Sequence, residues 1–386
     1  VSPQDSWLES GLPSHTAVHR VRGLGAHWSR LPGLGQLNAR CGRALYRRGR
    51  DLLASKRFDM VYFSTTQFPV HLLGPKWNRV FGVPFTMDYQ DPWINDYYDR
   101  HPHVIPPGGR LKYRIVNFFS QMNEPRVLRK CAGITSVSAA YPEQLRRRYH
   151  FLLTSWPTLV LPFPGDSADF RRMISSPAQQ DIFDPHDGRA HWVYVGRGGA
   201  DMETALSALF LALKSMESVR PNWLDSIRLH FIGTSYAPAG RAVKSIQPLA
   251  EKLGVDRIVE ETTARVPYST ALRCILDAHA LLVLGSNDAG YTASKIYPYL
   301  LAEKPTLAVF RSESSVVDLI RRVGGATVVP FEAGTSPEEL SIDIRQMWLE
   351  QQQFCHRAPF DSAKFLPHTA SAQAEQLTEF FDRCSR

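Results

Sequence analysis

Short apolar runs alternate with amphipathic stretches along most of the chain, although the first 35 residues show no clear periodicity. An apolar run of about four to eight residues is typical of a buried strand, whereas apolar positions three and four apart favour a helix. The first half is expected to form helices at 37–55, 72–81, 110–130 and 140–148, and strands at 60–64, 84–88 and 133–136. This alternation predicts a doubly wound parallel sheet.

A second series follows a polar stretch at 164–190. It is expected to form strands at 191–195, 228–232, 257–260, 280–284, 306–309 and 326–330, and helices at 202–216, 240–253, 268–278, 294–302, 314–323 and 337–353, with an amphipathic segment at 369–382. We therefore expect an α/β protein of two Rossmann-like, doubly wound domains facing a cleft. The expected divisions are a first domain at 1–165, a linker at 166–190, a second domain at 191–360 and a C-terminal helical segment at 361–386.

Composition narrows the class of protein. The 386 residues are 44% hydrophobic and 21% charged, which is typical of a soluble globular protein. No apolar run approaches the length of a bilayer span, and no signal-peptide pattern opens the chain. The five cysteines are far apart in the sequence and fit neither a disulfide framework nor a metal-binding spacing, so a cytoplasmic location is expected. Because the chain begins at Val1, it is expected to be a fragment or a processed product.

Positive charge is concentrated in the first half. Residues 1–150 hold 22 Lys+Arg and 10 Asp+Glu, a balance of +12, whereas the whole chain carries +8. The arginine-rich segments 40–50 and 146–148 fit solvated helix faces, with contact to the inner face of a membrane as the second interpretation. No nucleic-acid-binding motif is present, so nucleic acid is not an expected partner.

The segment at 280–310 predicts a strand, a polar loop, a helix and a second strand. Lys295 falls in the first turn of that helix, beside the loop residues Tyr291, Thr292 and Ser294. A cation beside a helix N-terminus suits a phosphate, because the first helical N–H groups are free to bind an anion. A solvated lysine at a helix start would give the same pattern.

Two further strand ends of the second half carry candidate ligand groups. In VYVGRGGAD (193–201), Gly196 and Gly198 let the backbone approach a ligand, and Arg197 supplies a forked charge for phosphate oxygens. A tight strand–helix turn explains the glycines equally well. In RVPYSTAL (265–272), the backbone of Arg265, Val266 and Pro267 could contact a nucleobase.

In the first half, two carboxylates follow the predicted strand 84–88. Asp88 and Asp91 lie in MDYQDPW beside aromatic residues, a combination that holds sugars or orients a hydroxyl group. The alternative is an aspartate that caps a turn, with the tryptophan packing the loop. The segment STTQFP (64–69) ends the preceding strand and offers hydroxyl groups at the same edge. No Ser-His-Asp, Cys-His or HExxH pattern appears, and no metal site is expected.

Together these segments resemble a GT-B glycosyltransferase of the large retaining family 4 type. The resemblance rests on FDMVYFSTTQFP, GVPFTMDYQDPW and GITSVSAAY in the first half, and on HWVYVGRGG, RLHFIGTSY, RVPYSTALRCILDAHALLVLGS and SKIYPYLLAEKPTLAVF in the second. It implies transfer of a hexose from a nucleotide-sugar donor to a glycan, lipid-linked or small-molecule acceptor in bacterial polysaccharide biosynthesis. It also implies retention of configuration, no metal or other cofactor, and a last helix packed on the first domain.

The resemblance also implies residue roles. Arg197 and Lys295 would neutralise the donor diphosphate, and Asp88 and Asp91 would orient the acceptor or the transferred sugar. Further donor contacts would come from Gly196, Gly198, Arg265, Val266, Pro267, Ser286, Tyr291, Thr292 and Ser294, and acceptor contacts from Thr65, Thr66, Gln90 and Trp93.

The chain departs from the family pattern at three places. The usual pair of glutamates, which has seven residues between its members, is replaced by Gly290 and Pro298, and the lysine shortly after Arg197 is absent. The usual opening strand is not visible in residues 1–30, so the first domain is expected to lack it. Two alternatives stay open: a GT-B-like sugar epimerase, and a catalytically degenerate binding or scaffold subunit.

Overall fold

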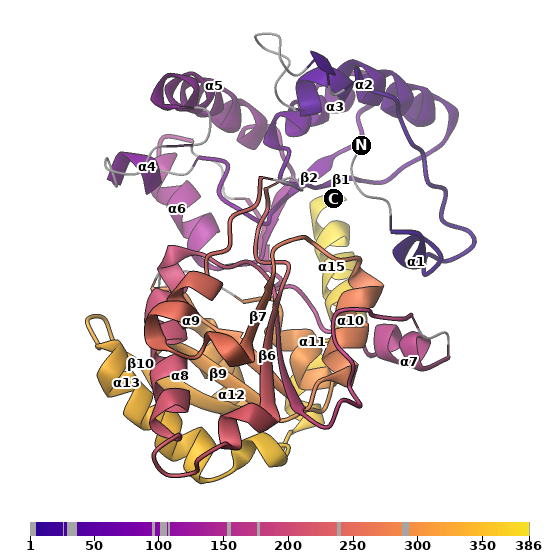
Figure 1. The fold of residues 1–386 in the computed structure, drawn as a ribbon. Coiled ribbons are helices and arrows are strands. Elements are labelled where there is room, and N and C mark those ends of the chain that lie inside the picture. Colours follow the sequence, from indigo (N-terminus) through magenta and orange to yellow (C-terminus); the bar gives the residue numbers. More distant parts are fainter. Residues whose placement is uncertain are drawn as a thin grey trace. The chain divides into compact units, whose positions relative to one another are not determined.

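The computed structural model describes residues 5–25, 27–28, 37–94, 97–100, 106, 109–152, 156–175, 178–237, 241–287 and 293–385 (Figure 1). The chain divides into two compact units, each of which is described by itself. Unit 1 comprises residues 1–2, 13–162 and 373–386, and unit 2 comprises residues 3–12 and 163–372. Residues 166–190, interpreted from the sequence as a linker, therefore belong to unit 2, where α7 (Ser167–Ser175) forms.

Unit 2 is built on one sheet of six parallel strands in the order β10-β9-β8-β5-β6-β7. The strands are β5 (Ala190–Val195), β6 (Ile227–Ile232), β7 (Val259–Thr262), β8 (Ala280–Leu284), β9 (Thr306–Arg311) and β10 (Thr327–Phe331). The chain moves from β5 outward to β7, returns to β8 beside β5, and then moves outward to β10 on the other side. The sheet therefore has a topological switch point between β5 and β8.

Helices cover both faces of this sheet. They are α8 (Glu203–Ser215), α9 (Gln247–Leu253), α10 (Tyr268–Asp277), α11 (Ile296–Leu301), α12 (Ser315–Val323), α13 (Pro337–Ile344) and α14 (Ser362–Phe365). Along β8, Leu282 and Leu284 join the apolar cluster under α8 and α13, whereas Leu281 and Val283 join the cluster under α10, α11 and α12. Successive side chains of a strand point to opposite faces, so a strand covered on both sides has to be apolar throughout.

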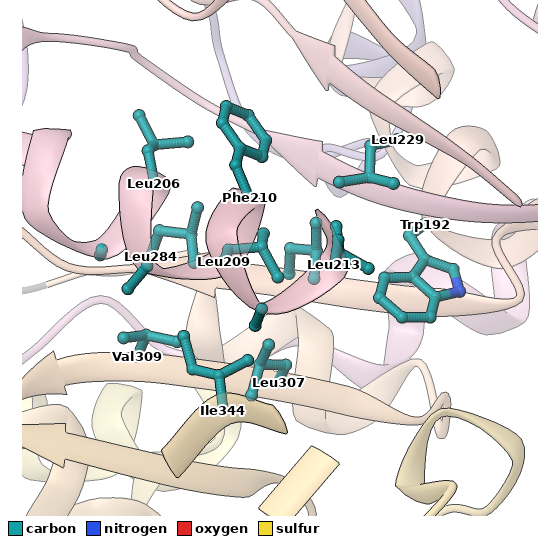
Figure 2. Packing of buried hydrophobic residues seen from close by; sticks show 14 of the residues in the cluster. Trp192, Leu206, Leu209, Phe210, Leu213, Leu229, Leu284, Leu307, Val309 and Ile344 are labelled. Carbon is teal, nitrogen blue, oxygen red and sulfur yellow. The ribbon is translucent and has the colours of Figure 1, made fainter. Parts of the chain in front are cut away.

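Figure 2 shows the packing on the α8 side of the sheet. Leu206, Leu209, Phe210 and Leu213 of α8 belong to the same apolar cluster as Trp192 of β5, and Leu213 is the one that lies beside the Trp192 ring. All five side chains are at most 1% exposed. Each large side chain removed from water in this way contributes about 1.5–3 kcal/mol to folding before the entropy of ordering is subtracted. This core holds the strand ends that carry the candidate site.

Unit 1 contains a smaller parallel sheet in the order β1-β2-β3-β4. The strands are β1 (Val61–Ser64), β2 (Phe85–Tyr89), β3 (Gly133–Ser136) and β4 (Thr158–Val160), and the helices include α2 (Leu37–Ser55), α3 (Leu73–Phe81), α4 (Tyr97–Arg100), α5 (Arg110–Leu128) and α6 (Ala140–Arg148). The core of unit 1 is aromatic: Phe63 stacks on Trp77 with ring centroids 5.9 Å apart, and it meets Phe85 edge-on.

Both ends of the chain cross between the units. The short helix α1 (Ser6–Glu9) belongs to unit 2, and Asp5 accepts from the backbone N–H of Tyr268 at the start of α10. The last helix, α15 (Ala370–Ser385), has residues 373–385 in unit 1, where the Phe381 ring meets Tyr62 at 5.1 Å. Gly133 of β3 also lies against Phe380 and Cys384 of this helix, and a Cβ atom there would collide with both side chains.

The expected α/β fold with two parallel-sheet domains is confirmed, and several element boundaries differ from expectation. The helix expected at 240–253 forms only over Gln247–Leu253, because the buried Glu261 carboxylate accepts from the amides of Ser245, Ile246 and Gln247 and fixes its start. The strand expected at 257–260 begins at Val259, since Asp256–Ile258 forms a 3-10 turn. Helix α13 ends at Ile344 and continues as a π-helix over Arg345–Glu350.

A buried histidine pair ties β5 to β6 in unit 2. His191 Nδ1 lies 2.9 Å from His230 Nε2, and His191 Nε2 lies 3.0 Å from Asp187 Oδ1. The Phe183 ring stacks on both imidazoles at 4.7 and 4.6 Å. Burial, followed by the neighbouring His191, lowers the pKa of His230 to about 4. Near neutral pH, His230 is therefore uncharged in the folded protein.

We expect this pair to make stability depend on pH. The pKa of His230 rises from about 4 in the folded chain to the ordinary 6.5 when the chain unfolds, so the unfolded state binds more protons between these values. The free energy of unfolding should fall by up to about 3 kcal/mol as pH drops from 6.5 to 4. Urea unfolding at pH 7.5, 6.0 and 5.0 measures this loss.

The test variant is His230→Leu. The control is His15→Gln, which changes an exposed histidine. His230→Leu should be less stable at pH 7.5 but should lose less stability on acidification, whereas His15→Gln should follow the wild type. Some pH dependence should persist in His230→Leu, because burial also lowers the pKa of His71 in unit 1 to about 4. An unchanged pH slope in His230→Leu would contradict the assignment.

Candidate functional site

The carboxyl ends of β5 and β8 carry the first candidate site, in unit 2. These two strands are neighbours at the switch point of the sheet, with Trp192 paired to Ala280 and Val193 to Leu281. Gly196 and Arg197 directly follow β5, and Lys295 directly precedes α11, the helix that follows β8. Ligands of open parallel sheets bind at such a switch point, because the loops leaving it diverge and open a crevice.

Lys295 lies against the aromatic ring of Tyr194. Its Nζ atom is 3.7 Å from the Tyr194 ring centroid, and a Cβ atom at Gly196 would overlap the same nitrogen. Gly196 has a φ of 148°, which also favours glycine. The Nζ atom is buried, and among the described residues no hydrogen-bond partner reaches it. Tyr194 and Gly196 thus make room for a buried ammonium group that no described carboxylate neutralises.

The charges around Lys295 are positive. Burial lowers the pKa of the Lys295 ammonium well below its ordinary range, and the nearby charges of Arg197 and Arg265 lower it further. A buried charge without a counter-ion is costly, and an anion that enters the site removes that cost. The three cations therefore form a site whose electrostatic requirement is a group with more than one negative charge.

Arg197 is held by a carboxylate of its own loop. Its two terminal nitrogens donate to Asp201 Oδ1 and Oδ2 at 2.8 and 2.6 Å, and the Tyr194 hydroxyl donates to the Arg197 carbonyl at 2.7 Å. The hydrogen bonds from Arg197 have the largest effect on the pKa of Asp201 and lower it. Burial opposes this shift and a hydrogen bond from Ser286 adds to it, so the pKa is lowered overall. Ser286 is buried and supports Asp201. Arg197 is consequently pre-oriented but largely neutralised, which leaves Lys295 as the cation whose charge is least balanced.

Arg265 and Tyr236 form a flat surface at the ends of β6 and β7. The Arg265 guanidinium lies 4.6 Å from the Tyr236 ring centroid, and Tyr236 is 74% exposed. Val266 packs partly against the core, and Pro267 precedes α10. An exposed aromatic ring with a guanidinium group against it can stack on a planar base.

Part of the predicted donor loop lies outside the described residues, namely Gly290, Tyr291 and Thr292. Ser294 is described and exposed. Helix α11 begins at Ile296, later than expected, and has six residues. Its first amides, Ile296 and Tyr297, donate to the carbonyls of Ala293 and Ser294. The expected contribution of a helix N-terminus is therefore reduced, and the attraction for an anion comes from the side-chain cations.

Asp88 lies at the centre of a hydrogen-bond network in unit 1. It was expected at the end of the strand 84–88, and in the structure it lies inside β2, one residue before the end, and is 8% exposed. Its Oδ2 accepts from Ser64 and Gln90, each at 3.0 Å, and its Oδ1 accepts from Thr135 at 2.8 Å. Ser64, Asp88 and Thr135 come from three neighbouring strands, so the Asp88 carboxylate links β1, β2 and β3 at the carboxyl edge of the sheet.

The other predicted residues of unit 1 differ in exposure. Thr66 and Asp91 are exposed at the ends of β1 and β2, and Thr65 accepts from the Gln67 amide at 3.0 Å. Burial of its carboxyl group nevertheless raises the pKa of Asp91. Trp93 is buried and stacks on Phe68 at 5.6 Å, so its ring packs the core, as the alternative interpretation of this loop expected.

Sequence reasoning missed the residues that complete both groups. Tyr194, Asp201 and Tyr236 of unit 2 and Thr135 of unit 1 were not singled out, and Ser64 was included only as part of the segment 64–69. The spacing of four between Arg197 and Asp201 was a usable signal for an ion pair. Among the described residues, no three His, Cys, Asp or Glu side chains group as metal ligands.

Comparison with known proteins identifies the fold. No family model and no curated protein matches the sequence. Solved structures do match: a UDP-forming α,α-trehalose-phosphate synthase from Burkholderia xenovorans superposes with a TM-score of 0.54 at 12% identity, over 94% of this chain and 84% of that one. HepE from Anabaena, solved with UDP and glucose, gives 0.54 at 12% identity over 88% and 80%. A glycosyltransferase from Rickettsia africae gives 0.52 at 11% identity over 92% and 83%.

These three matches extend over both units of the chain and have low sequence identity. They agree with the two parallel-sheet α/β domains described above and with the expected resemblance. The chain has the GT-B fold.

Proposed function

We propose that this protein is a glycosyltransferase that moves a sugar from a nucleotide-sugar donor to a glycan, lipid-linked or small-molecule acceptor. The observation that carries the proposal is the buried Lys295 ammonium between Tyr194 and Gly196 at the β5–β8 switch point. Similar folds solved with UDP support the class of donor. UDP is accordingly the first nucleotide to test.

The cations of unit 2 suit the departure of a nucleoside diphosphate. In sugar transfer, the bond between the anomeric carbon and the diphosphate oxygen breaks, an acceptor hydroxyl oxygen bonds to that carbon, and its proton passes to a base or to the leaving group. Lys295 and Arg265, with Arg197, would stabilise the negative charge that develops on the diphosphate. Because side chains can supply this charge, we propose transfer without a metal. Retention of configuration is proposed from the resemblance to family 4 enzymes.

Unit 1 would bind the acceptor through the carboxyl edge of its sheet. The Asp88 network holds Ser64 and Gln90 at that edge, and Asp91 and Thr66 are exposed beside it. Since burial raises the pKa of the Asp91 carboxyl, this group is a better proton acceptor than an ordinary aspartate. We propose that Asp91 orients an acceptor hydroxyl, whereas Asp88 positions its neighbours.

A lipid-linked acceptor would bring the protein to a membrane surface. Among the described residues, no helix is both long and apolar enough to cross a bilayer. We therefore propose a peripheral contact through the basic first half, on the inner face of a cytoplasmic membrane.

A binding protein without turnover is the second candidate. Pro298, inside α11, stands where the family has a glutamate, so this position offers no carboxylate to the donor. A protein that binds UDP but releases none from a panel of UDP-sugars with glycan and lipid-linked acceptors would support this candidate.

Lys295→Met tests the donor site. UDP should raise the melting temperature of the wild type by mass action, and the variant should bind UDP at least about tenfold more weakly because a charge-assisted contact is lost. Without UDP, the variant should melt at the same or a higher temperature, because it no longer buries an unpaired charge. Thermal shift and calorimetry measure both effects.

The control is Lys304→Met, which removes a half-buried lysine at the start of β9, the opposite end of the sheet from the site. This control should keep wild-type affinity for UDP. If Lys295→Met bound UDP as tightly as the wild type, the site assignment would be wrong.

The same change of carboxylate to amide at two positions tests the proposed roles: Asp88 as a structural residue and Asp91 as the one that orients the acceptor. The variants are Asp88→Asn and Asp91→Asn. Asp88→Asn should destabilise unit 1 by about 1–3 kcal/mol, because an amide cannot satisfy all the donors that surround it. Asp91→Asn should leave stability unchanged and lower sugar transfer. Wild-type transfer should decline on acidification at a higher pH than an ordinary aspartate would cause, and Asp91→Asn should lose this decline. Equal turnover in Asp91→Asn and the wild type would exclude the proposed role.

A further inference from the structure

Helix α5 of unit 1, labelled in Figure 1, carries exposed apolar side chains along one side. The stripe consists of Leu111, Ile115, Phe118, Phe119 and Met122, whose side chains are 37–75% exposed. Spacings of four, three, one and three residues place these positions on one side of an α-helix. Two adjacent phenylalanines more than half exposed are a large unpartnered apolar surface for a single helix.

The opposite side of α5 faces the rest of unit 1 and is mostly polar until the last turn, where Val127 and Leu128 are buried. Tyr113, Asn117 and Ser120 are half-buried, and Glu124 is fully buried. The amphipathic pattern is therefore reversed relative to an ordinary surface helix, which buries its apolar stripe.

The buried end of α5 fixes this orientation. Glu124 accepts from the Tyr89 hydroxyl at 3.2 Å and from the Tyr149 hydroxyl at 2.6 Å, and Arg148 lies 3.5 Å away. Val127 and Leu128 next to it are fully buried. Rotation of the helix to hide its apolar stripe would expose these residues and break both hydrogen bonds, so the stripe stays outward.

The exposed charges on α5 are all positive. Arg110, Lys112, Arg114 and Arg126 are exposed, and the one acidic residue of the helix is the buried Glu124. Arg129 and Lys130 continue the positive charge just beyond the last turn. An apolar stripe flanked by lysine and arginine, with no exposed acid on the helix, is typical of helices that lie in the plane of an anionic lipid surface.

We infer that the outward stripe of α5 docks this protein on a membrane that contains anionic lipids. The apolar side chains would enter the boundary between headgroups and acyl chains, and the flanking cations would meet the lipid phosphates. A second copy of the chain is a poorer occupant, because two such helices would bring the same positive flanks together. The inference extends the proposed membrane contact, but it requires neither donor binding nor turnover.

The test is flotation of the full chain with unilamellar vesicles. Wild-type protein should float with phosphatidylcholine vesicles that contain phosphatidylglycerol, and much less with phosphatidylcholine alone or at high salt. The double variant Phe118→Ser/Phe119→Ser should reduce the partition coefficient at least about tenfold, because two large apolar side chains no longer leave water. Lys112→Glu/Arg114→Glu should remove the preference for anionic lipid.

The control is Ile174→Ser on α7, which removes a 75% exposed apolar side chain outside the stripe and should float as the wild type does. Circular dichroism confirms that each variant is folded, and UDP binding measured in parallel separates loss of docking from failure of the proposed donor site. Three results would each overturn the inference: wild-type protein that does not float with anionic vesicles, unchanged flotation of the phenylalanine variant, or a dimer in sedimentation velocity that Phe118→Ser/Phe119→Ser dissociates.

Discussion

The buried ammonium of Lys295 is the constraint on which the candidate site depends. A charge enclosed by protein has to be balanced, and among the described residues the charges that act on the pKa of Lys295 are the cations Arg197 and Arg265. The surrounding residues accommodate this group: Gly196 leaves it room, and the Tyr194 ring faces it. In the free protein these surroundings favour the neutral amine of Lys295, and a polyanionic ligand at this position would favour its charged form. Such pre-organised charge is the usual way in which a protein stabilises a negatively charged leaving group.

The ionisable groups of Asp88 and Lys295 differ in their hydrogen-bond partners. Asp88 in unit 1 is surrounded by donors from Ser64, Gln90 and Thr135, so its negative charge is satisfied within the fold. Lys295 has no described donor or acceptor at its nitrogen. A satisfied buried charge contributes to structure, whereas an unsatisfied polar group at a strand end is a candidate for ligand contact. This contrast supports the proposed division between Asp88, which would position its neighbours, and the exposed Asp91, which would contact a ligand.

The sequence predicted most strands of the two sheets, because parallel strands covered on both faces, such as β8 and β9 of unit 2, are continuous apolar runs. It did not predict β4, which has three residues and no buried side chain, so its apolar pattern is weak. The start of α9 depends on Glu261, a residue distant in the sequence whose carboxylate accepts the amides before the helix. Local periodicity cannot reveal a cap from another strand. For the same reason the sequence named Arg197, Arg265 and Lys295 as separate candidates but could not show that their charges act on one another, since the three residues follow different strands.

The glutamate missing at Pro298 is consistent with this electrostatic arrangement. In the family that the chain resembles, a carboxylate pair accompanies the lysine, whereas here position 298 is a proline within α11. Asp201 also follows β5, but both of its carboxylate oxygens accept hydrogen bonds from Arg197. The positive charge of Lys295 is therefore not offset by the protein to the degree that a nearby glutamate would provide. If the proposed donor site is correct, the absence of that acid would strengthen the attraction for a diphosphate and would remove an acceptor for sugar or ribose hydroxyls. Selectivity among sugars would then have to come from other groups.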